Sequence, residues 1–454
     1  MKNSMIYKKA LTIAVPMMIQ NGITNMVGLV DNLMVGSLGT EAMTGVAIVN
    51  QLLFVNNLAI FGGLAGPGIY GAQYYGKGDK KGFQNTVRFK FWICLFCVVI
   101  AALLFATQAD LLIGLYLKGE SQSLDRAATL LFGKEYLAVM IATLVPFAIT
   151  QVYASSLRET GETMKPMVAG IVSVFVDIIF NYALIFGHFG FPKLGVVGAA
   201  LATVLARITE CLIVVIWSHI KRKKHSFLVG LYQTFKVPAA QCVQIGKKGL
   251  PIFANEFFWA SSMAVLTQNY SMKGLSVVAG INISNTICNL FNVSFIALGS
   301  SVGVILGQYL GGKEFEKAKK ASRVLMNFTA GVSLFFGLLL ILISGIFPGF
   351  YDTTVQVKHM ATRFIICTAL FFPIQGYINA MYFTLRSGGK TLITFLFDSV
   401  FNCLISVPVA FVLCRYSPLP ILVIYAVIQA LDLIKLVIGG ILIRKGVWIS
   451  NLVE

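Results

Sequence analysis

Twelve long apolar segments, separated by short polar connections, restrict what this 454-residue chain can fold into. A membrane-spanning helix needs about 20 mainly apolar residues, because the hydrocarbon core of a bilayer is about 30 Å thick. Hydrophobic residues make up 57% of the chain and charged residues only 12%, whereas soluble proteins carry about 25% charged residues. This composition excludes a soluble enzyme, a secreted disulfide scaffold and a disordered chain. The sequence predicts an all-α polytopic membrane protein with twelve transmembrane helices, at residues 10–36, 44–72, 91–117, 136–157, 166–187, 195–220, 249–272, 277–310, 324–348, 359–385, 391–414 and 419–443.

The basic residues are unevenly distributed between the two ends of these segments. The chain has 36 Lys+Arg and 18 Asp+Glu, which gives a formal net charge of +18. With the N-terminus inside, 26 basic residues fall in cytoplasmic segments and 2 deep within spans, and 8 are external when Arg363, near the start of the span 359–385, is counted with the outer segments. This asymmetry follows the positive-inside rule and predicts that both termini are cytoplasmic. Because no region outside the spans is long enough for a basic recognition domain, we expect the lipid bilayer as a partner and no nucleic acid.

The two halves of the chain repeat each other. A shift of 235 residues superposes them without a gap over 73 positions. Among the matched pairs are Pro16 and Pro251, Asn50 and Asn285, and Gly76 and Gly311. Later, after a shorter connection in the second half, Asp177-x-x-x-Asn181 corresponds to Asp398-x-x-x-Asn402. We predict two pseudo-symmetric six-helix lobes, residues 1–220 and 246–454, joined by a cytoplasmic linker at 221–245, with a central cavity between them.

We place six acidic residues in the membrane core of the predicted spans, where an ionised carboxylate costs at least about 2.5–3.5 kcal/mol. They are Asp31, Asp177, Glu210, Glu256, Asp398 and Asp432. Glu210 is three residues from Arg207 and Asp432 three from Lys435, so each spacing predicts an ion pair on one helix face. The other four acids lack such a neighbour. Two interpretations stay open for them: a carboxyl group hydrogen-bonded between helices, or a group that takes up a proton or cation during transport.

Asparagines form a stripe on the eighth predicted span. Asn282, Asn285, Asn289 and Asn292 recur along one helix face, and Asn50 and Asn57 form a partial counterpart on the second span. These amides either bridge helices or line a wet cavity.

Three matches to enzyme motifs lack the context that their chemistry needs. Gly71-x-x-x-x-Gly76-Lys77 and its counterpart at 307–313 resemble a phosphate-binding loop, but neither continues with Ser or Thr, and each ends a predicted membrane helix. A tight cytoplasmic turn explains both. Gly299-x-Ser301-x-Gly303 matches a nucleophile elbow in letters only, and close helix packing explains its spacing better. We therefore expect neither enzyme activity nor a cofactor.

Several motifs together resemble one transporter family. They are Pro16, residues 30–36 (VDNLMVG), 71–76 (GAQYYG), 180–182 (FNY) with Gly187, and 195–203 (GVVGAALAT). On these motifs the chain resembles the MATE (multidrug and toxic compound extrusion) transporters of the MOP flippase superfamily, over essentially its whole length. The resemblance implies a V-shaped cavity between two lobes and drug efflux driven by inward flow of H+ or Na+.

The resemblance also implies roles for single residues. Asp31 occupies the family's acidic position in the first helix, which makes it the main candidate for cation coupling. Asp177 and Asn181 reverse the Asn-x-x-x-Asp order of the proton-coupled branch but share one helix face, so we expect them close to Asp31. A Na+ ion would bind at Asp31 and Asn181. Glu256 resembles the seventh-helix glutamate of one branch and is a second-lobe candidate for coupling.

Other positions are expected to line the substrate cavity or to bend helices. Gln375 stands where the sodium-coupled bacterial branch has an aspartate, so the sodium-site pattern is incomplete. The cavity candidates are Asn50, Asn57, Asn282, Asn285, Asn289, Gln375 and Asp398, and the expected bends are at Pro16 and Pro251.

We expect a secondary antiporter that exports organic, cationic and amphipathic compounds in exchange for H+ or Na+ by alternating access. It would act as a monomer in the plasma membrane, the inner membrane of a bacterium. The alternative is a lipid or lipid-linked oligosaccharide flippase of the same superfamily, which would favour a cavity rich in cations.

Overall fold

The computed structural model describes residues 3–117, 125–221, 225–351 and 353–454. Helices form almost all of this part of the chain, and none of its residues lies in a strand, which confirms the predicted all-α fold. The helices are α1 (Asn3–Gly36), α2 (Thr40–Lys77), α3 (Lys80–Thr107), α4 (Ala109–Tyr116), α5 (Arg126–Met140), α6 (Leu144–Glu159), α7 (Met164–Phe186), α8 (Gly195–Ile220), α9 (Ala239–Ser271), α10 (Leu275–Gly311), α11 (Phe315–Ile343), α12 (Val355–Ser387), α13 (Thr391–Phe395), α14 (Val407–Tyr416), α15 (Ile421–Ala430) and α16 (Asp432–Arg444). Short 3-10 segments are η2 (Ile141–Thr143), η3 (Ser226–Leu228), η4 (Leu231–Gln233) and η5 (Phe347–Phe350), and two π-helical segments are η6 (Leu396–Val400) and η7 (Asn402–Ser406).

Eleven helical segments in the described residues are long and apolar enough to cross a membrane. They correspond to all the predicted spans except 249–272, and some join two shorter helices, as α5 and α6 do at Arg126–Glu159. The segment 249–272 lies within α9, which is an unbroken helix of 33 residues. Polar side chains such as Lys247, Lys248 and Glu256 lower the mean hydropathy of α9, so its length fits a span better than its composition does.

The chain forms two compact units. The N-terminal unit comprises Ile19–Gly68 and Lys80–Cys242, and the C-terminal unit comprises Met1–Met18, Ile69–Asp79 and Val243–Glu454. Helices α1, α2 and α9 each continue from one unit into the other. In α1 the boundary between the units lies two residues after Pro16, and in α2 it lies one residue after Pro67. Each boundary therefore lies beside a proline, which has no backbone N–H to donate. The lobe boundaries expected at 220 and 246 remain a prediction.

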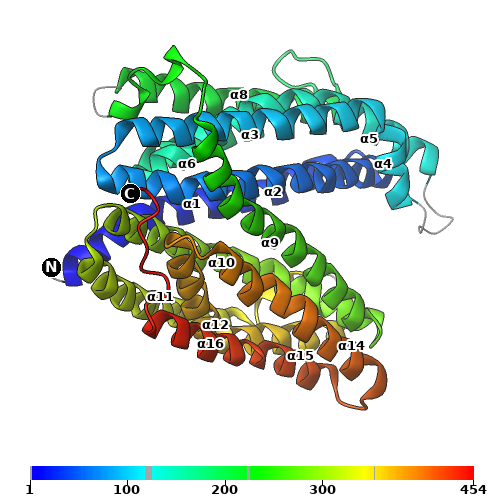
Figure 1. Cartoon of the computed structure of the whole chain (residues 1–454). Coiled ribbons are helices and arrows are strands. Elements are labelled where there is room, and N and C mark those ends of the chain that lie inside the picture. The colour runs from blue at the N-terminus through cyan, green and yellow to red at the C-terminus, as the bar shows by residue number, and fades with distance from the viewer. Residues whose placement is uncertain (1–2, 118–124, 222–224, 352) are drawn as a thin grey trace. The chain divides into compact units, whose positions relative to one another are not determined.

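In the N-terminal unit, α3 packs against α6, while α5, α6 and α7 pack against α8 (Figure 1). Small residues permit the closest approaches: a Cβ on Gly198 of α8 would meet the backbone of Leu184 in α7. Residues 225–237, which follow α8, lie along α3 and are held there by its side chains. The N-terminal unit therefore carries its own connecting segment as part of its packing.

In the C-terminal unit, α12 packs against α10, α11, α15 and α16 (Figure 1). The start of α1 joins this core through Ile6, Ala10 and Ile13, all buried. The ends of α2 and α10 cross at matched positions of the repeat, where a Cβ on Gly76 would meet the Gln308 carbonyl and one on Gly311 the Gln73 carbonyl.

The glycines that resembled enzyme motifs have structural roles. Helix α2 ends at Lys77 before Gly78, whose φ is +77°, and α10 ends at Gly311, so each loop-like motif closes a helix. At the other motif, Cβ atoms on Gly299 and Gly303 would both meet the ring of Phe383 in α12, as the close-packing interpretation predicts.

Candidate functional site

A polar cluster in the N-terminal unit contains Asp31 of α1 with Asp177 and Asn181 of α7. Asp177 and Asn181 are four residues apart, so they lie on one face of α7 and both are buried. Asn181 Nδ2 donates a hydrogen bond of 2.9 Å to Asp31 Oδ1. The structure thus brings together three residues that the sequence placed in separate helices 150 positions apart.

The two acidic side chains of this cluster lie within hydrogen-bonding range of each other. Two ionised carboxylates at this separation repel each other, and a proton or a bound cation between them removes the repulsion. Arg207 is close enough to act on both electrostatically, but its guanidinium already pairs with Glu210 at 3.0 Å, as the sequence predicted. The cluster therefore has an excess of negative charge in a largely buried place.

Two oxygen atoms of the cluster are available to a cation. Asp177 Oδ1 and Asn181 Oδ1 are buried and have no hydrogen-bond partner among the described residues. Oxygen atoms of carboxylates and amides are the ligands that hard cations prefer. Within the same described part of the chain, no three His, Cys, Asp or Glu side chains gather as a metal site. The amide of Asn181 would therefore have to complete the ligands that Asp31 and Asp177 supply.

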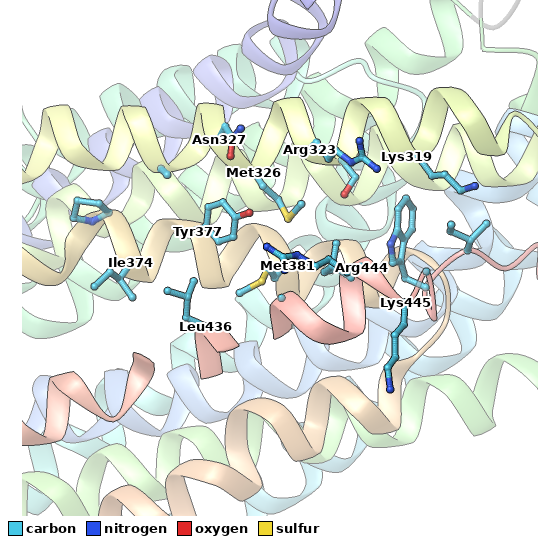
Figure 2. Close-up of a pocket in the computed structure, with 18 residues that line it drawn as sticks. Lys319, Arg323, Met326, Asn327, Ile374, Tyr377, Met381, Leu436, Arg444 and Lys445 are labelled. Atoms are coloured by element: carbon cyan, nitrogen blue, oxygen red, sulfur yellow. The ribbon is translucent and has the colours of Figure 1, made fainter. Parts of the chain in front are cut away.

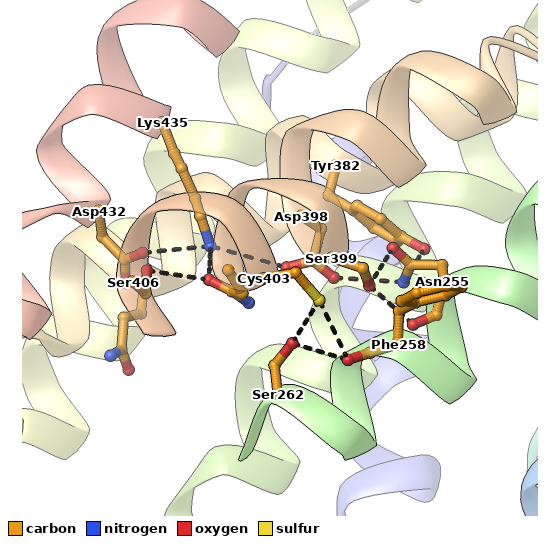
Figure 3. A network of polar contacts seen from close by, with 12 residues as sticks. Asn255, Phe258, Ser262, Tyr382, Asp398, Ser399, Cys403, Ser406, Asp432 and Lys435 are labelled. Atoms are coloured by element: carbon orange, nitrogen blue, oxygen red, sulfur yellow. Dashed lines mark hydrogen bonds and ion pairs between the residues drawn. The ribbon is translucent and has the colours of Figure 1, made fainter. Parts of the chain in front are cut away.

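A second polar cluster lies in the C-terminal unit around Lys435 of α16, which is only 5% exposed. Its ammonium group lies 3.3 Å from Asp432 Oδ1, 3.7 Å from Asp398 Oδ1 and 2.9 Å from Asn402 Oδ1 (Figure 3). The pair Asp432–Lys435 was predicted from its spacing. The contact between Lys435 and Asp398 was not predicted, because nothing in the sequence shows that α16 approaches the π-helical segments.

Helix α9 completes this second cluster. Asn255 Nδ2 donates to Asp398 Oδ2 at 3.2 Å, and Ser399 Oγ donates to the backbone and side-chain oxygens of Asn255 at 2.7 Å each (Figure 3). Asp398 and Ser399 lie in η6 and Asn402 in η7. π-Helical turns are rare and frequently mark functional sites, and here they carry the acid and the amide that hold Lys435.

The remaining predicted site residues, Glu256, Gln375, Pro16 and Pro251, belong to neither polar cluster. Glu256 is half-buried on α9, within electrostatic range of Arg386 and Asp398, and belongs to the C-terminal unit, whereas Asp31 belongs to the N-terminal unit. Gln375 donates from Nε2 to Gln429 Oε1 at 3.0 Å. Pro16 and Pro251 lie inside the continuous helices α1 and α9.

The asparagine stripe is mostly exposed. Asn282, Asn285 and Asn289 are exposed on α10, and Asn292 donates to Asn289 within the same helix at 3.3 Å. In the N-terminal unit, Asn50 is exposed and accepts a hydrogen bond of 3.4 Å from Tyr136, whereas Asn57 is half-buried. Sequence reasoning missed Asn255 and Lys435 as members of a polar cluster. The repeat, which marks Asp398 and Asn402 as counterparts of Asp177 and Asn181, was the one available signal.

Comparison with known proteins settles the family. The MatE family model matches residues 16–183 and 251–412. The chain belongs to the MatE family. It is a multi-pass membrane transporter and not an enzyme.

Relatives and solved structures agree over nearly the full length. The chain is 28% identical over 431 residues to multidrug resistance protein NorM of Thermotoga maritima, covering 92% of this chain and 88% of that protein. It is 25% identical over 429 residues to multidrug resistance protein YoeA of Bacillus subtilis, covering 92% and 89%. A crystal structure of a MATE protein in the bent conformation has a TM-score of 0.83 at 18% identity, covering 98% and 97%. A MOP superfamily transporter from Pyrococcus furiosus, described as having a binding pocket of reverse polarity, also has a TM-score of 0.83 at 18% identity, covering 97% and 95%.

Proposed function

We propose that this MatE-family chain is a secondary antiporter that exports organic, cationic and amphipathic compounds in exchange for H+ or Na+. The relatives NorM and YoeA carry the name multidrug resistance protein, which supports efflux of such compounds. The excess of basic residues at one end of the spans supports an orientation with both termini cytoplasmic, in a bacterial inner membrane. We propose that a single copy of the chain is sufficient for transport.

The observation that carries the proposal is the uncompensated polar cluster of Asp31, Asp177 and Asn181. Asp177 Oδ1 and Asn181 Oδ1 receive no hydrogen bond from any described residue, and Asp31 and Asp177 lie side by side. An arrangement that only held helices together would satisfy these oxygens, because an unpaired buried polar atom costs about 1–3 kcal/mol. A site that takes up and releases a cation must keep them available.

Coupling follows if the cation binds the two access states of the transporter with different affinity. Uptake of H+ or Na+ at Asp31 removes the repulsion between Asp31 and Asp177 and favours the state in which both are shielded from water. Asp31 lies on the same helix as Pro16, where the missing backbone donor lowers the cost of bending. Bending of α1 would then change the affinity for the exported compound, which leaves as the cation enters.

The experiment is dye export from proteoliposomes under separately imposed pH and Na+ gradients. A fluorescent cationic dye reports export, and Asp31→Asn keeps the shape of the side chain while removing the group that takes up the cation. We expect this variant to insert and fold but to lose gradient-driven export. Asp110→Asn is the matched control, because Asp110 forms an exposed pair with Lys134 at 2.8 Å and has no part in the cluster. Full export by Asp31→Asn would remove Asp31 from the mechanism.

The alternative function is a lipid or lipid-linked oligosaccharide flippase. A flippase for such anionic head groups would need cations where this chain has the acidic pair Asp31 and Asp177. The same vesicles distinguish the two, because a flippase moves a fluorescent lipid between leaflets and leaves the cationic dye in place.

A further inference from the structure

A groove of about 930 Å³ lies in the C-terminal unit among α11, α12, α16 and the start of the C-terminal tail (Figure 2). None of its lining residues belongs to the two polar clusters described above. Its walls change character along their length. Lys319, Arg323 and Lys445 lie toward one end, and Ile374 and Leu436 lie at the other (Figure 2).

At the basic end of the groove, three of the four basic side chains have no acidic partner among the described residues. Arg323, Arg444 and Lys445 are exposed, and none of them forms an ion pair with a described residue. Lys319 is half-buried and pairs with the exposed Glu316 at 2.7 Å. With the orientation proposed above, this end of α11 and α16 faces the cytoplasm, at the level of the lipid head groups.

The opposite end of the groove is apolar and lies deeper in the membrane. Leu436 precedes Arg444 by eight residues along α16, a rise of about 12 Å. On α12, Pro373 and Ile374 precede Met381 by at least seven residues and so lie further from the C-terminal end of the helix. The groove therefore runs along the helices from its basic end toward the middle of the membrane. A groove with a cationic mouth and an apolar channel is complementary to a phospholipid, whose anionic head group would lie at the mouth and whose acyl chain would lie in the channel.

The internal repeat shows that the first half fills the same place with its own chain. Lys319, Arg323 and Asn327 correspond to Gln84, Arg88 and Trp92 of α3. Gln84 donates to the carbonyls of Phe227 and Val229 at 2.9 Å each, Arg88 Nε donates to Leu231 O at 3.0 Å, and Trp92 Nε1 donates to Phe235 O at 3.0 Å.

In the second half, the chain after α16 takes a different course. Trp448 is buried against Gly388, and the tail then reaches α2 and α10, where Leu452 N donates to Gln73 Oε1 at 2.7 Å and Asn451 Nδ2 to Gly311 O at 3.3 Å. Arg323 and Asn327 therefore stay exposed, in contrast to the buried and bonded Arg88. The groove that the linker occupies in one half is open in the other.

We propose that this groove binds one anionic phospholipid, with its phosphate group at Arg323 and Arg444 and an acyl chain along Ile374 and Leu436. Two guanidinium groups match a phosphate in charge and in hydrogen-bonding geometry. The apolar channel below them removes the acyl chain from the bulk bilayer. The lipid takes the place that residues 225–237 hold in the first half.

The test uses the full-length protein purified in a mild detergent and titrated with phosphatidylglycerol or phosphatidylcholine of identical acyl chains. Native mass spectrometry counts the bound lipids. We expect one phosphatidylglycerol to bind well above phosphatidylcholine. In the double variant Arg323→Gln/Arg444→Gln its affinity falls by about 25-fold, about fivefold for each arginine. Lys80→Gln/Lys81→Gln is the matched control, because it removes two exposed basic residues at the start of α3 that do not line the groove.

A second variant tests the apolar channel without touching the charges. Gly440 lines the groove, and a Cβ there would meet no atom within 4 Å, so the first atom of a larger side chain has open space at this wall. Gly440→Phe is chosen to place a ring in the channel. We expect it to abolish binding of the lipid while the melting temperature of the lipid-free protein stays unchanged.

Three results would overturn the proposal. The first is equal binding of phosphatidylglycerol and phosphatidylcholine. The second is an equal loss of phosphatidylglycerol affinity in the arginine variant and in the lysine control. The third is a protein dimer that carries no bound lipid, which would mean that a second copy of the chain covers the groove. Lipid binding is measured without a transport gradient. A failure of the export assay would therefore contradict the proposed antiport and leave the lipid-binding result unaffected.

Discussion

The Asp-x-x-x-Asn motif occurs once in each half of the chain, and the two copies hold different partners. In the N-terminal unit Asn181 donates to the carboxylate of Asp31, and Asp177 lies beside it. In the C-terminal unit Asn402 accepts from the ammonium group of Lys435, which also lies near Asp398. The residue that matches Asp31 in the repeat is Leu266, so the second half has lost the acid and gained a cation from another helix.

This difference indicates separate tasks for the two halves. The second cluster already contains its cation, covalently tethered as Lys435 and held by two acids and an amide. The first cluster has two acids and, among the described residues, two oxygens without a hydrogen-bond donor, and under the proposal above it takes its cation from solution. The proposal therefore assigns a fixed polar cluster around Lys435 and an exchangeable polar cluster around Asp31.

The largest expected effect comes from removing the tethered cation. Lys435→Met leaves Asp398 and Asp432 without a cationic partner, and breaking a buried ion pair costs about 3–5 kcal/mol. Thermal unfolding in detergent measures the loss. Asp31→Asn is the comparison variant, and we expect it to melt near the parent temperature. If Asp31→Asn proves to be the less stable of the two, the assignment of fixed and exchangeable clusters is reversed.

The two polar clusters predict different effects for matched residues of the two halves, whereas the crossing of α2 and α10 predicts equal losses of stability for its two matched glycines. Gly76→Ala and Gly311→Ala each place a methyl group against the backbone carbonyl of the other helix. We expect both to destabilise the protein by about 1–3 kcal/mol, since the backbones must separate. Gly114→Ala is the control, because a Cβ there meets no atom within 4 Å. Unequal losses at Gly76 and Gly311 would show that the repeat is not symmetric at this contact.

The amide of the exchangeable cluster has a smaller expected effect. Asn181→Leu removes the hydrogen bond to Asp31 and leaves both acids in place. Export should fall by about tenfold at equal protein, because a hydrogen bond to a charged group contributes about 1.5–3 kcal/mol. Asn402→Leu in the second half should lower stability without changing the gradient dependence. A loss of gradient dependence in Asn402→Leu would make the second cluster a coupling site as well.

The smallest expected effect concerns the exposed ion pair between Lys313 and Glu454, in contrast to the buried pairs of Lys435. Lys313 lies 2.9 Å from Glu454, and its hydrogen bond and then its charge lower the pKa of that carboxyl group. A lowered folded-state pKa contributes stability above the unfolded pKa, and the contribution disappears as pH falls through the folded value. Because both groups are exposed to solvent, Glu454→Gln should leave the melting temperature unchanged at neutral pH and in high salt. A clear loss at neutral pH would show that the tail depends on this pair.

Much of the fold was predictable because each span is a local property of the sequence. Apolar length predicts twelve spans, and eleven of them are long and apolar enough in the described residues, whereas α9 has the length but its polar residues lower its hydropathy. Neighbours on one helix, such as Arg207 with Glu210, were predictable from spacing. The approach of Lys435 to Asp398 was not, because the π-helical turns and the position of α16 depend on packing between helices far apart in sequence.

The linker segment along α3 has a consequence for the order in which the protein is made. Residues 225–237 follow α8 directly, so the groove on α3 closes as soon as about half of the chain has left the ribosome. The tail after α16 is held at Gln73 and Gly311 and does not fill the matching groove on α11. Under the lipid proposal, the first half therefore completes its groove with its own chain during synthesis, whereas the second half completes its groove only when a lipid binds.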